Sequence, residues 1–197
     1  EFLTLAQEAW YNGGNDPTKF WDSSGVLVDG LTRGQALATD TDWQDTALRT
    51  GVAYRANISA SGGDEKTKFF VSGNFLDEES IFVGNEYLRL NARTNLTHQL
   101  NKKVSIGSNM NFSYVNNSPV PVQNGVGKSN TNLPIHPVYK EDGTYFNVLR
   151  NPRAGIDLFT TNIKNRSFIA SWYIRYQIAN GLDFRTEYGL NSICLLY

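Results

Sequence analysis

The sequence predicts an all-β fold, in which long antiparallel strands form part of a transmembrane β-barrel. The first observation behind this prediction is a strict alternation of polar and apolar residues over 87–100 and again over 104–114. Successive side chains of a strand point to opposite faces, so this pattern builds a sheet with one apolar and one polar face. A transmembrane strand needs about 9–11 tilted residues, whereas a typical globular strand has about 5–6.

The same alternation recurs along the chain and gives six predicted strands. We expect these strands near 52–61, 67–77, 86–100, 103–115, 166–179 and 181–192. A polar lumen and an apolar outer belt produce such a signature. A soluble antiparallel sandwich with one solvated face produces it equally well, so alternation alone leaves both interpretations open.

The second observation is that the connections alternate in length. Residues 62–66, 101–103 and 180–181 form tight turns, whereas 77–85 is longer and 116–165 is very long. Bacterial outer-membrane barrels have short turns on the periplasmic side and long loops outside. A soluble meander has no reason to follow this order, so the connections favour the membrane barrel.

Composition limits the other classes of function. The 197 residues carry a formal net charge of -1 with a pI near 6.2, which argues against a nucleic-acid partner. Mean hydropathy is -0.39, and the chain has no apolar run long enough for a membrane helix. Aromatic residues make up 13% of the chain and suit interfacial girdles or a glycan-binding surface. A single cysteine, Cys194, excludes an intrachain disulfide.

Three segments lie outside the predicted strands. Residues 1–50 are irregular, with a short helix expected near the start and a helical turn expected from Trp43 to Leu48. The connection 116–165 is Pro-rich but carries enough apolar residues to predict a packed loop. The tail 193–197 receives no assignment.

A series of motifs resembles the SusC/RagA family of TonB-dependent transporters. It begins with TDWQD at 41–45 and NISASGGDEKTKFFVSG at 57–73, and it continues with FLDEESI at 75–81 and YLRLNARTNL at 87–96. The resemblance is strong over about residues 40–116 and weaker elsewhere. The family usually has glycine at the position of Ser80, which affects only a barrel position.

The resemblance implies a fold and a function. It implies a 22-stranded transmembrane barrel in the bacterial outer membrane, of which this chain holds six strands without the N-terminal plug. Residues 1–50 then form an extracellular loop region, 51–192 form the six strands with an extracellular loop at 116–165, and the tight turns face the periplasm. The implied activity is import of oligosaccharide or peptide with a SusD-like surface lipoprotein. TonB acts through the plug segment, and outer-membrane lipid surrounds the wall.

Candidate site residues fall into two groups. The first group projects to the polar face, where it contacts plug or lumen carboxylates or passing substrate: Arg55, Arg89, Asn91, Arg93, Arg175 and Arg185. The second group offers aromatic faces for sugar rings and amides for hydroxyl groups from the two loop regions: Trp10, Trp21, Tyr139, Tyr145 and Asn147. We expect plug contacts for most of the arginines.

Two other hypotheses remain beside the transporter. One is a soluble surface module, a β-sandwich that binds glycans. The other is a glycosidase that uses Asp183 and Glu187, although nothing places these carboxyls across a cleft. The preferred interpretation is that the protein is not an enzyme and needs no metal or cofactor.

Overall fold

The computed structural model describes residues 2–16, 20, 31–120, 127, 131–159 and 161–196. These residues form two compact units, which are considered separately below. The loop unit comprises residues 1–49 and 120–160, and the sheet unit comprises residues 50–119 and 161–197.

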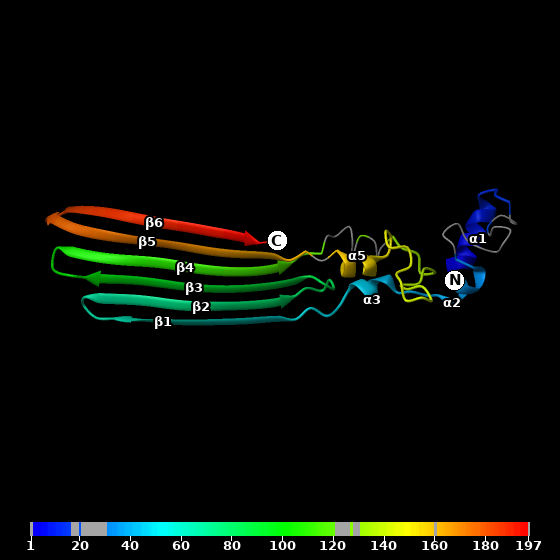
Figure 1. The fold of residues 1–197 in the computed structure, drawn as a ribbon, viewed down its shortest axis with the longest axis horizontal. Coiled ribbons are helices and arrows are strands. Elements are labelled where there is room, and N and C mark those ends of the chain that lie inside the picture. The colour runs from blue at the N-terminus through cyan, green and yellow to red at the C-terminus, as the bar shows by residue number, and fades with distance from the viewer. Residues whose placement is uncertain are drawn as a thin grey trace. The chain divides into compact units, whose positions relative to one another are not determined.

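The sheet unit is one antiparallel meander in which each strand pairs with the next (Figure 1). Tight turns and longer connections alternate along it, as the sequence predicts. The strands are β1 (Ala53–Gly63), β2 (Thr67–Glu79), β3 (Glu86–Gln99), β4 (Val104–Ser118), β5 (Ile163–Ala179) and β6 (Leu182–Leu196). All six predicted strands are confirmed, and the longest, β5, has 17 residues.

The register keeps the two faces distinct across the sheet. Phe69, Leu96 and Ser108 are consecutive partners in one row, and the next row on the opposite face joins Phe70, Asn95 and Asn109. Partners in an antiparallel pair share a face, so the alternation within each strand becomes a property of the whole sheet. The pairing of β5 with β6 shifts once, between Gln177 and Ala179.

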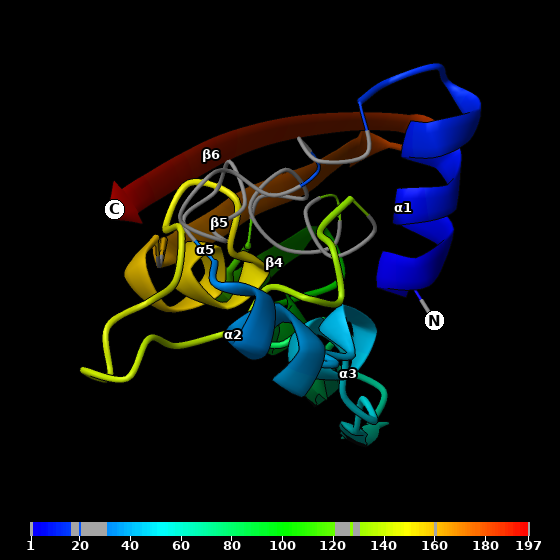
Figure 2. The ribbon, with the colours of Figure 1, turned by 90° about the vertical axis from the view of Figure 1, so that its right-hand side faces the viewer.

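The apolar face has no second layer over it among the described strands. Leu90, Leu96 and Phe112 are 39%, 47% and 43% exposed, and Ile58 is 77% exposed. Strand β6 follows a curved path when the sheet is viewed from its loop end (Figure 2), as twisted, coiled sheets do. A sandwich buries this face under another sheet, whereas all six described strands belong to a single sheet.

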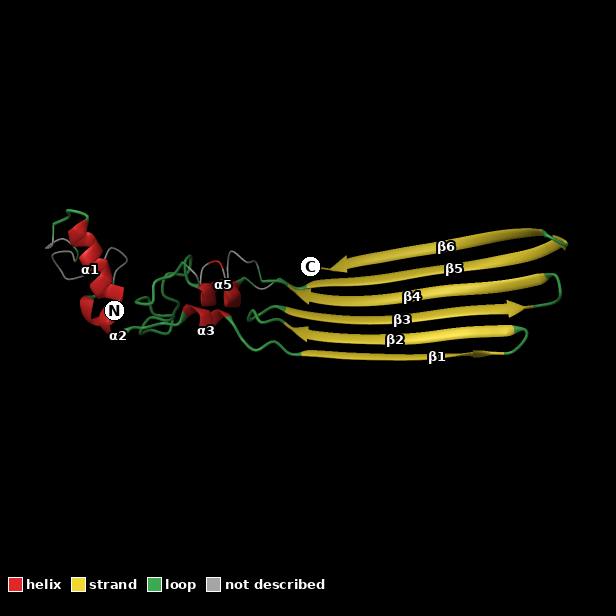
Figure 3. Ribbon diagram, turned by 180° about the vertical axis from the view of Figure 1, so that it is seen from behind, coloured by secondary structure: helices red, strands yellow, loops and turns green. Residues whose placement is uncertain are grey.

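The described residues of the loop unit form short helices (Figure 3). They are α1 (Phe2–Asn12), α2 (Arg33–Ala38), α3 (Trp43–Ala47) and α5 (Pro152–Leu158). Each of the last three begins with a side chain that caps it, which is how such short helices satisfy their first amides. Thr32 forms a capping box with Gln35, Asp42 caps α3, and Asn151 caps α5.

Residues 41–43 hold the long connection in place. The hydroxyl of Thr41 donates to the carbonyl of His136 at 2.8 Å, and the indole N–H of Trp43 donates to the carbonyl of Leu133 at 2.8 Å. Helix α3 packs against α5, and Trp43, Ile135 and Ile156 are buried. The expectation of a packed loop agrees with this small core.

The structure differs from the sequence expectations at three places. Helices α2 and α5 were not predicted, and the segment 193–196 continues β6 rather than forming a tail. The long connection is also shorter than expected, since β4 runs to Ser118 and β5 begins at Ile163. No helix in the described ranges combines the length and apolarity needed to cross a membrane.

Candidate functional site

The predicted arginines share one face of the sheet unit. Arg55 and Arg89 lie in the same cross-strand row, on either side of Leu76. Arg93 lies two rows further toward the turns, between Ser72 and Asn111. Asn91 occupies the row between, next to Asn74. The sequence prediction of a shared polar face therefore agrees with the register.

The arginines divide into two groups by their partners. Arg175 forms an ion pair with Asp183, and Arg185 forms one with Glu187 at 2.9 Å. Between described residues, no ion pair involves the other three arginines of this face: Arg55, Arg89 and Arg93. Arg175 and Arg185, toward the turn end, are therefore paired within the sheet, whereas Arg55, Arg89 and Arg93 have no ion pair with another described residue.

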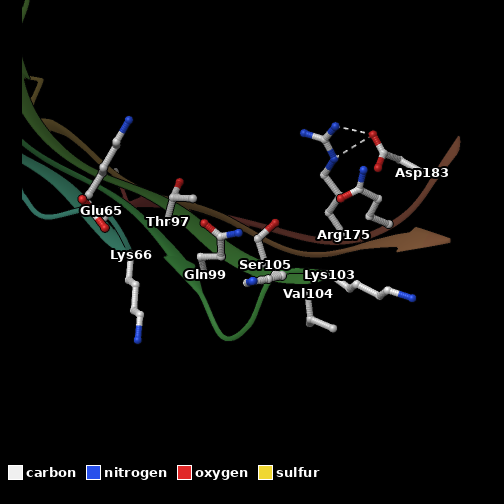
Figure 4. A pocket seen from close by; sticks show the side chains of 12 residues that line it. Glu65, Lys66, Thr97, Gln99, Lys103, Val104, Ser105, Arg175 and Asp183 are labelled. Atoms are coloured by element: carbon white, nitrogen blue, oxygen red, sulfur yellow. Dashed lines mark hydrogen bonds and ion pairs between the residues drawn. The ribbon is translucent and has the colours of Figure 1, made fainter. Parts of the chain in front are cut away.

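Residues at the turn end of the sheet line an open cavity of about 390 Å³ (Figure 4), and the side chains of Lys66 and Val104 point to one side of the sheet. The side chains of Thr97, Ser105 and Arg175 point to the opposite side in this view. Its lining is almost entirely polar: Glu65, Lys66, Lys68, Thr97, Gln99, Lys102, Lys103, Val104, Ser105, Arg175, Gln177 and Asp183. Sequence reasoning identified Arg175 and missed the lysines, although three of them stand in the two tight turns.

Asp183 and Glu187 do not form the carboxyl pair that a glycosidase needs. Each accepts from its own arginine on the polar face, and neither lies across a cleft from the other. In the part of the chain that the structure describes, no three His, Cys, Asp or Glu residues are close enough to hold a metal ion. The arrangement supports binding rather than covalent chemistry.

The loop unit carries a second cavity, open to solvent, of about 670 Å³. Apolar and aromatic side chains line much of it, and the rest of the lining is polar: Leu31, Gln35, Ala38, Thr39, Pro137, Tyr139, Lys140, Glu141, Asp142 and Phe146. An apolar cavity with a few polar groups is the usual form of a small-molecule site. Tyr139 is 48% exposed and therefore accessible to a ligand.

Hydrogen bonds fix the aromatic side of this cavity. The rings of Tyr139 and Tyr145 lie 5.1 Å apart, and the hydroxyl of Tyr145 donates to Asp157 Oδ2 at 2.6 Å. This hydrogen bond raises the pKa of Tyr145 to about 12, so the phenol stays protonated at any physiological pH. Arg153 Nε also donates to Asp157 at 2.8 Å. Tyr139 thus packs against Tyr145, which is itself fixed by its hydrogen bond to Asp157.

The five residues predicted to contact substrate do not form one site. Tyr139 lines the cavity and Tyr145 supports it, whereas Asn147 forms a turn with φ of 44° whose carbonyl accepts from Asn151 N at 2.9 Å. The indole of Trp10 donates to the carbonyl of Asp16 at 2.8 Å and does not line the cavity. Trp21 lies outside the described residues.

Phe146 and Gln35 line the same cavity and were missed by sequence reasoning. A signal for Gln35 was present, because Thr32 three residues earlier makes the S/T-x-x-E/Q capping box. Nothing in the sequence places 31–39 beside 137–146.

Comparisons with known proteins agree with this architecture. TonB-dependent receptor P26 of Formosa agariphila is 31% identical over 144 residues, which cover 70% of this chain and 14% of the receptor. TonB-dependent receptor P39 of the same organism is 30% identical over 86% of this chain and 16% of the receptor. TonB-dependent receptor SusC of Bacteroides thetaiotaomicron is 27% identical over a match that covers 54% of this chain and 11% of that receptor.

Solved structures share the fold. A structure of the RagAB peptide transporter superposes with a TM-score of 0.61 at 16% identity and covers 78% of this chain and 19% of that one. No protein-family model matches the chain. The chain spans about one seventh of the length of the first of these relatives. The ordered motifs, the six-stranded wall and these relatives together place the chain in the SusC/RagA-like family of TonB-dependent transporters.

Proposed function

We propose that this chain forms part of the wall of an outer-membrane barrel that imports oligosaccharide or peptide nutrients. In this proposal a SusD-like surface lipoprotein delivers the cargo, and TonB supplies energy through a plug segment that lies outside these residues. The chain performs no covalent chemistry and needs no cofactor. Its own contribution is a lipid-facing wall, a polar inner face and a substrate-contacting loop unit.

The observation that carries the proposal is the uncovered apolar face of the sheet unit. Side chains such as Ile58, Ile174 and Phe184 are 77%, 52% and 58% exposed. Each large apolar side chain left in water costs about 1.5–3 kcal/mol relative to burial. Lipid around a barrel wall removes this cost, and the polar face then lines an enclosed interior.

The polar-face arginines have different roles in this proposal. Arg55, Arg89 and Arg93 contact acidic groups of the plug or of passing cargo, because the described residues offer them no ion-pair partner. Arg175 and Arg185 are held by Asp183 and Glu187 and contribute mainly to the sheet itself.

In this proposal the loop unit faces the outside of the cell and the tight turns face the periplasm. Cysteine labelling in the complete protein that contains this chain tests this orientation. In a Cys194→Ser background, Leu149→Cys in the loop unit and Lys102→Cys in a tight turn are treated with a membrane-impermeant maleimide on intact cells. Leu149 is 81% exposed, so the proposal expects rapid labelling there and labelling at position 102 only after permeabilisation. Equal labelling of both positions on intact cells would exclude the orientation.

The role of the loop cavity is tested by growth. A strain that lacks the complete protein is complemented with the wild type, Tyr139→Ala or the control Leu149→Ala, and is grown on defined oligosaccharides or peptide mixtures. We expect the deletion strain to lose growth on one of these nutrients. Tyr139→Ala then slows growth at limiting concentrations of that nutrient and Leu149→Ala does not. Undiminished growth of the deletion strain on every nutrient contradicts import.

The soluble glycan-binding sandwich is not adopted as a second candidate. Such a module needs two sheets packed face to face, and the described strands form a single sheet.

A further inference from the structure

The apolar face of the sheet unit is bordered by polar residues at both ends. At the loop end, one cross-strand row joins Asp77, Leu88, Asn116 and Lys164. At the turn end, another row on this face joins Thr67, His98 and Ile106, and the Thr67 hydroxyl is hydrogen-bonded to His98 Nδ1 at 2.8 Å. From Leu88 to His98, β3 has the length of about 9–11 residues that a tilted strand needs to cross the hydrocarbon core of a membrane. The His98 row therefore marks the edge of the apolar belt at the turn end.

Three lysines stand just beyond this edge. Lys66 directly precedes Thr67, and Lys102 and Lys103 stand in the turn between β3 and β4. All three are exposed and line the open cavity at the turn end. They are called the turn lysines below.

The turn lysines differ from Lys68 in the side to which they point. Figure 4 shows Lys66 pointing to the same side as Val104, which shares the apolar face with its register partner Tyr176. Lys103 also points away from the side to which Thr97 points. Lys68, by contrast, is the register partner of Thr97 and lies on the polar face. Lys66 lies before the first residue of β2, so the alternation of the strand does not fix its side chain.

Hydrogen bonds fix the backbone of both turns. In the first turn, Asp64 Oδ1 accepts from the backbone N–H groups of Lys66 at 2.8 Å and Thr67 at 2.6 Å. In the second turn, Asn101 Oδ1 accepts in the same way from Lys103 at 2.8 Å. The bases of the lysine side chains are therefore held in place before a ligand arrives, and such preorganisation reduces the entropy lost on binding.

The two turns carry more positive than negative charge. Their acidic residues are Asp64 and Glu65. The amide donors in its turn, that of Thr67 first, hold the pKa of Asp64 below its usual range, so this carboxylate stays engaged with the backbone. Glu65 then stands against three ammonium groups, and in the described ranges the turn lysines form no ion pair. Clustered like charges attract anions from a distance.

We propose that the turn lysines bind the phosphate group of an anionic phospholipid, in the leaflet that surrounds the turn end of the wall. This inference rests on the proposed function, because only a wall embedded in a membrane has lipid against its apolar face. The His98 row sets the level at which acyl chains give way to headgroups, and the turn lysines follow directly after it. Basic clusters just outside the hydrocarbon region recognise anionic lipids in this way.

Lysine suits this position better than arginine would. Its four-carbon stem can lie along apolar side chains while the ammonium group remains at the level of the headgroups. The ammonium is a compact, strongly hydrated point charge, whereas arginine makes rigid bidentate pairs. Exposed ion pairs are weak one by one and sensitive to salt. The bound lipid therefore exchanges with its neighbours, and the preference for anionic lipid falls as ionic strength rises.

Photo-crosslinking with lipids tests the inference in the complete protein. Phosphatidylethanolamine vesicles that hold the protein receive a trace of phosphatidylglycerol or of phosphatidylethanolamine, each with a diazirine beside the headgroup. After irradiation, adducts on the peptides that contain the two turns are quantified by mass spectrometry, at low salt and at about 0.5 M salt, where the Debye length is only a few ångströms. The variants combine Lys66→Gln, Lys102→Gln and Lys103→Gln, or the same three positions changed to arginine. Lys68→Gln is the matched control on the polar face.

The inference expects severalfold more adducts with phosphatidylglycerol than with phosphatidylethanolamine at the two turns. This ratio falls close to one in the triple glutamine variant and at high salt, and it persists in the triple arginine variant and in Lys68→Gln. Equal adducts of both lipids in the wild type overturn the inference, as does a ratio that is insensitive to salt, an equal loss in Lys68→Gln, or the absence of adducts at the turns. The salt series uses the wild type and decides the question even if the triple glutamine variant does not fold.

Cysteine labelling separates this inference from the proposed function. Correct labelling at positions 149 and 102, together with any of the contrary crosslinking results, rejects only the binding of anionic lipid. Equal labelling of both positions on intact cells rejects the orientation of the wall itself.

Discussion

Tyr173 on β5 lies across the backbone of Gly107, its register partner on β4. A β-carbon at Gly107 would overlap the Tyr173 ring. The ring is held over this gap from both sides, since its hydroxyl lies 3.3 Å from Thr97 Oγ1 and the guanidinium of Arg185 lies 4.1 Å from its centroid. Glycine weakens a strand because it has no side chain to pack, and here an aromatic neighbour supplies the missing packing.

The first prediction concerns this pair. Gly107→Ala displaces the Tyr173 ring and separates it from Arg185, so we expect the complete protein to lose about 1–3 kcal/mol of unfolding free energy, the usual cost of overpacking. Urea unfolding in detergent, followed by the gel-mobility difference between folded and unfolded barrel, measures the loss. Ser105→Ala, two residues away on the same face, is the control and should change the midpoint little.

A double-mutant cycle shows whether the ring is the cause. In a Tyr173→Ala background the alanine at position 107 has space, so its cost should fall to a small fraction of the value in the wild type. An equal cost in both backgrounds would mean that backbone propensity, and not the ring, explains the role of the glycine.

The strands were predictable because their signal is local. The alternation around Leu96 and Ile106 continues over the length of each strand, and a shift of one residue would move every side chain to the wrong face. The face of the sheet on which Arg89 and Arg93 lie could therefore be predicted from the alternation alone. The contact between Tyr173 and Gly107 could not be predicted in this way, because it depends on which residues meet across two strands more than 60 positions apart.

The loop unit was harder to predict for a related reason. Helices α2 and α5 have 6 and 7 residues, too few for a hydrophobic period to stand out, and isolated helices of that length are unstable in water. Their caps at Thr32 and Asn151 were visible in the sequence. The cavity could not be predicted from the sequence, since it requires Gln35 to lie near Phe146, which is far along the chain.

The second prediction tests which face contacts lipid. Phe112 lies near the middle of β4 on the apolar face, and Asn111 beside it lies on the polar face. Arginine near the bilayer midplane on the lipid side of a barrel costs about 2–4 kcal/mol. We therefore expect Phe112→Arg to reduce the folded fraction in outer membranes strongly and Asn111→Arg to reduce it little. If Asn111→Arg is the more damaging change, the assignment of the two faces is reversed.

The third prediction concerns Asn151, which is 1% exposed and joins three parts of the loop unit. Its amide donates to the carbonyls of Val138 at 2.7 Å and Phe146 at 3.0 Å, while its oxygen accepts from the first amides of α5. Asn151→Asp keeps the shape and the cap but removes both donations, and an unsatisfied buried carbonyl costs about 1–3 kcal/mol. We expect a local loss of at least about 2 kcal/mol, which corresponds to about 30-fold faster hydrogen exchange of the α5 amides.

The matched control for this change is Asn147→Asp, an identical substitution at an exposed residue four positions earlier. Aspartate tolerates the positive φ of 44° at that position, so hydrogen exchange in α5 should remain at the wild-type rate. Exchange in the strands of the sheet unit should also be unchanged in both variants, because the strands belong to a separate compact unit. Equal acceleration in the Asn147 variant would show that Asn151 owes its effect to added charge and not to the two carbonyls it bonds.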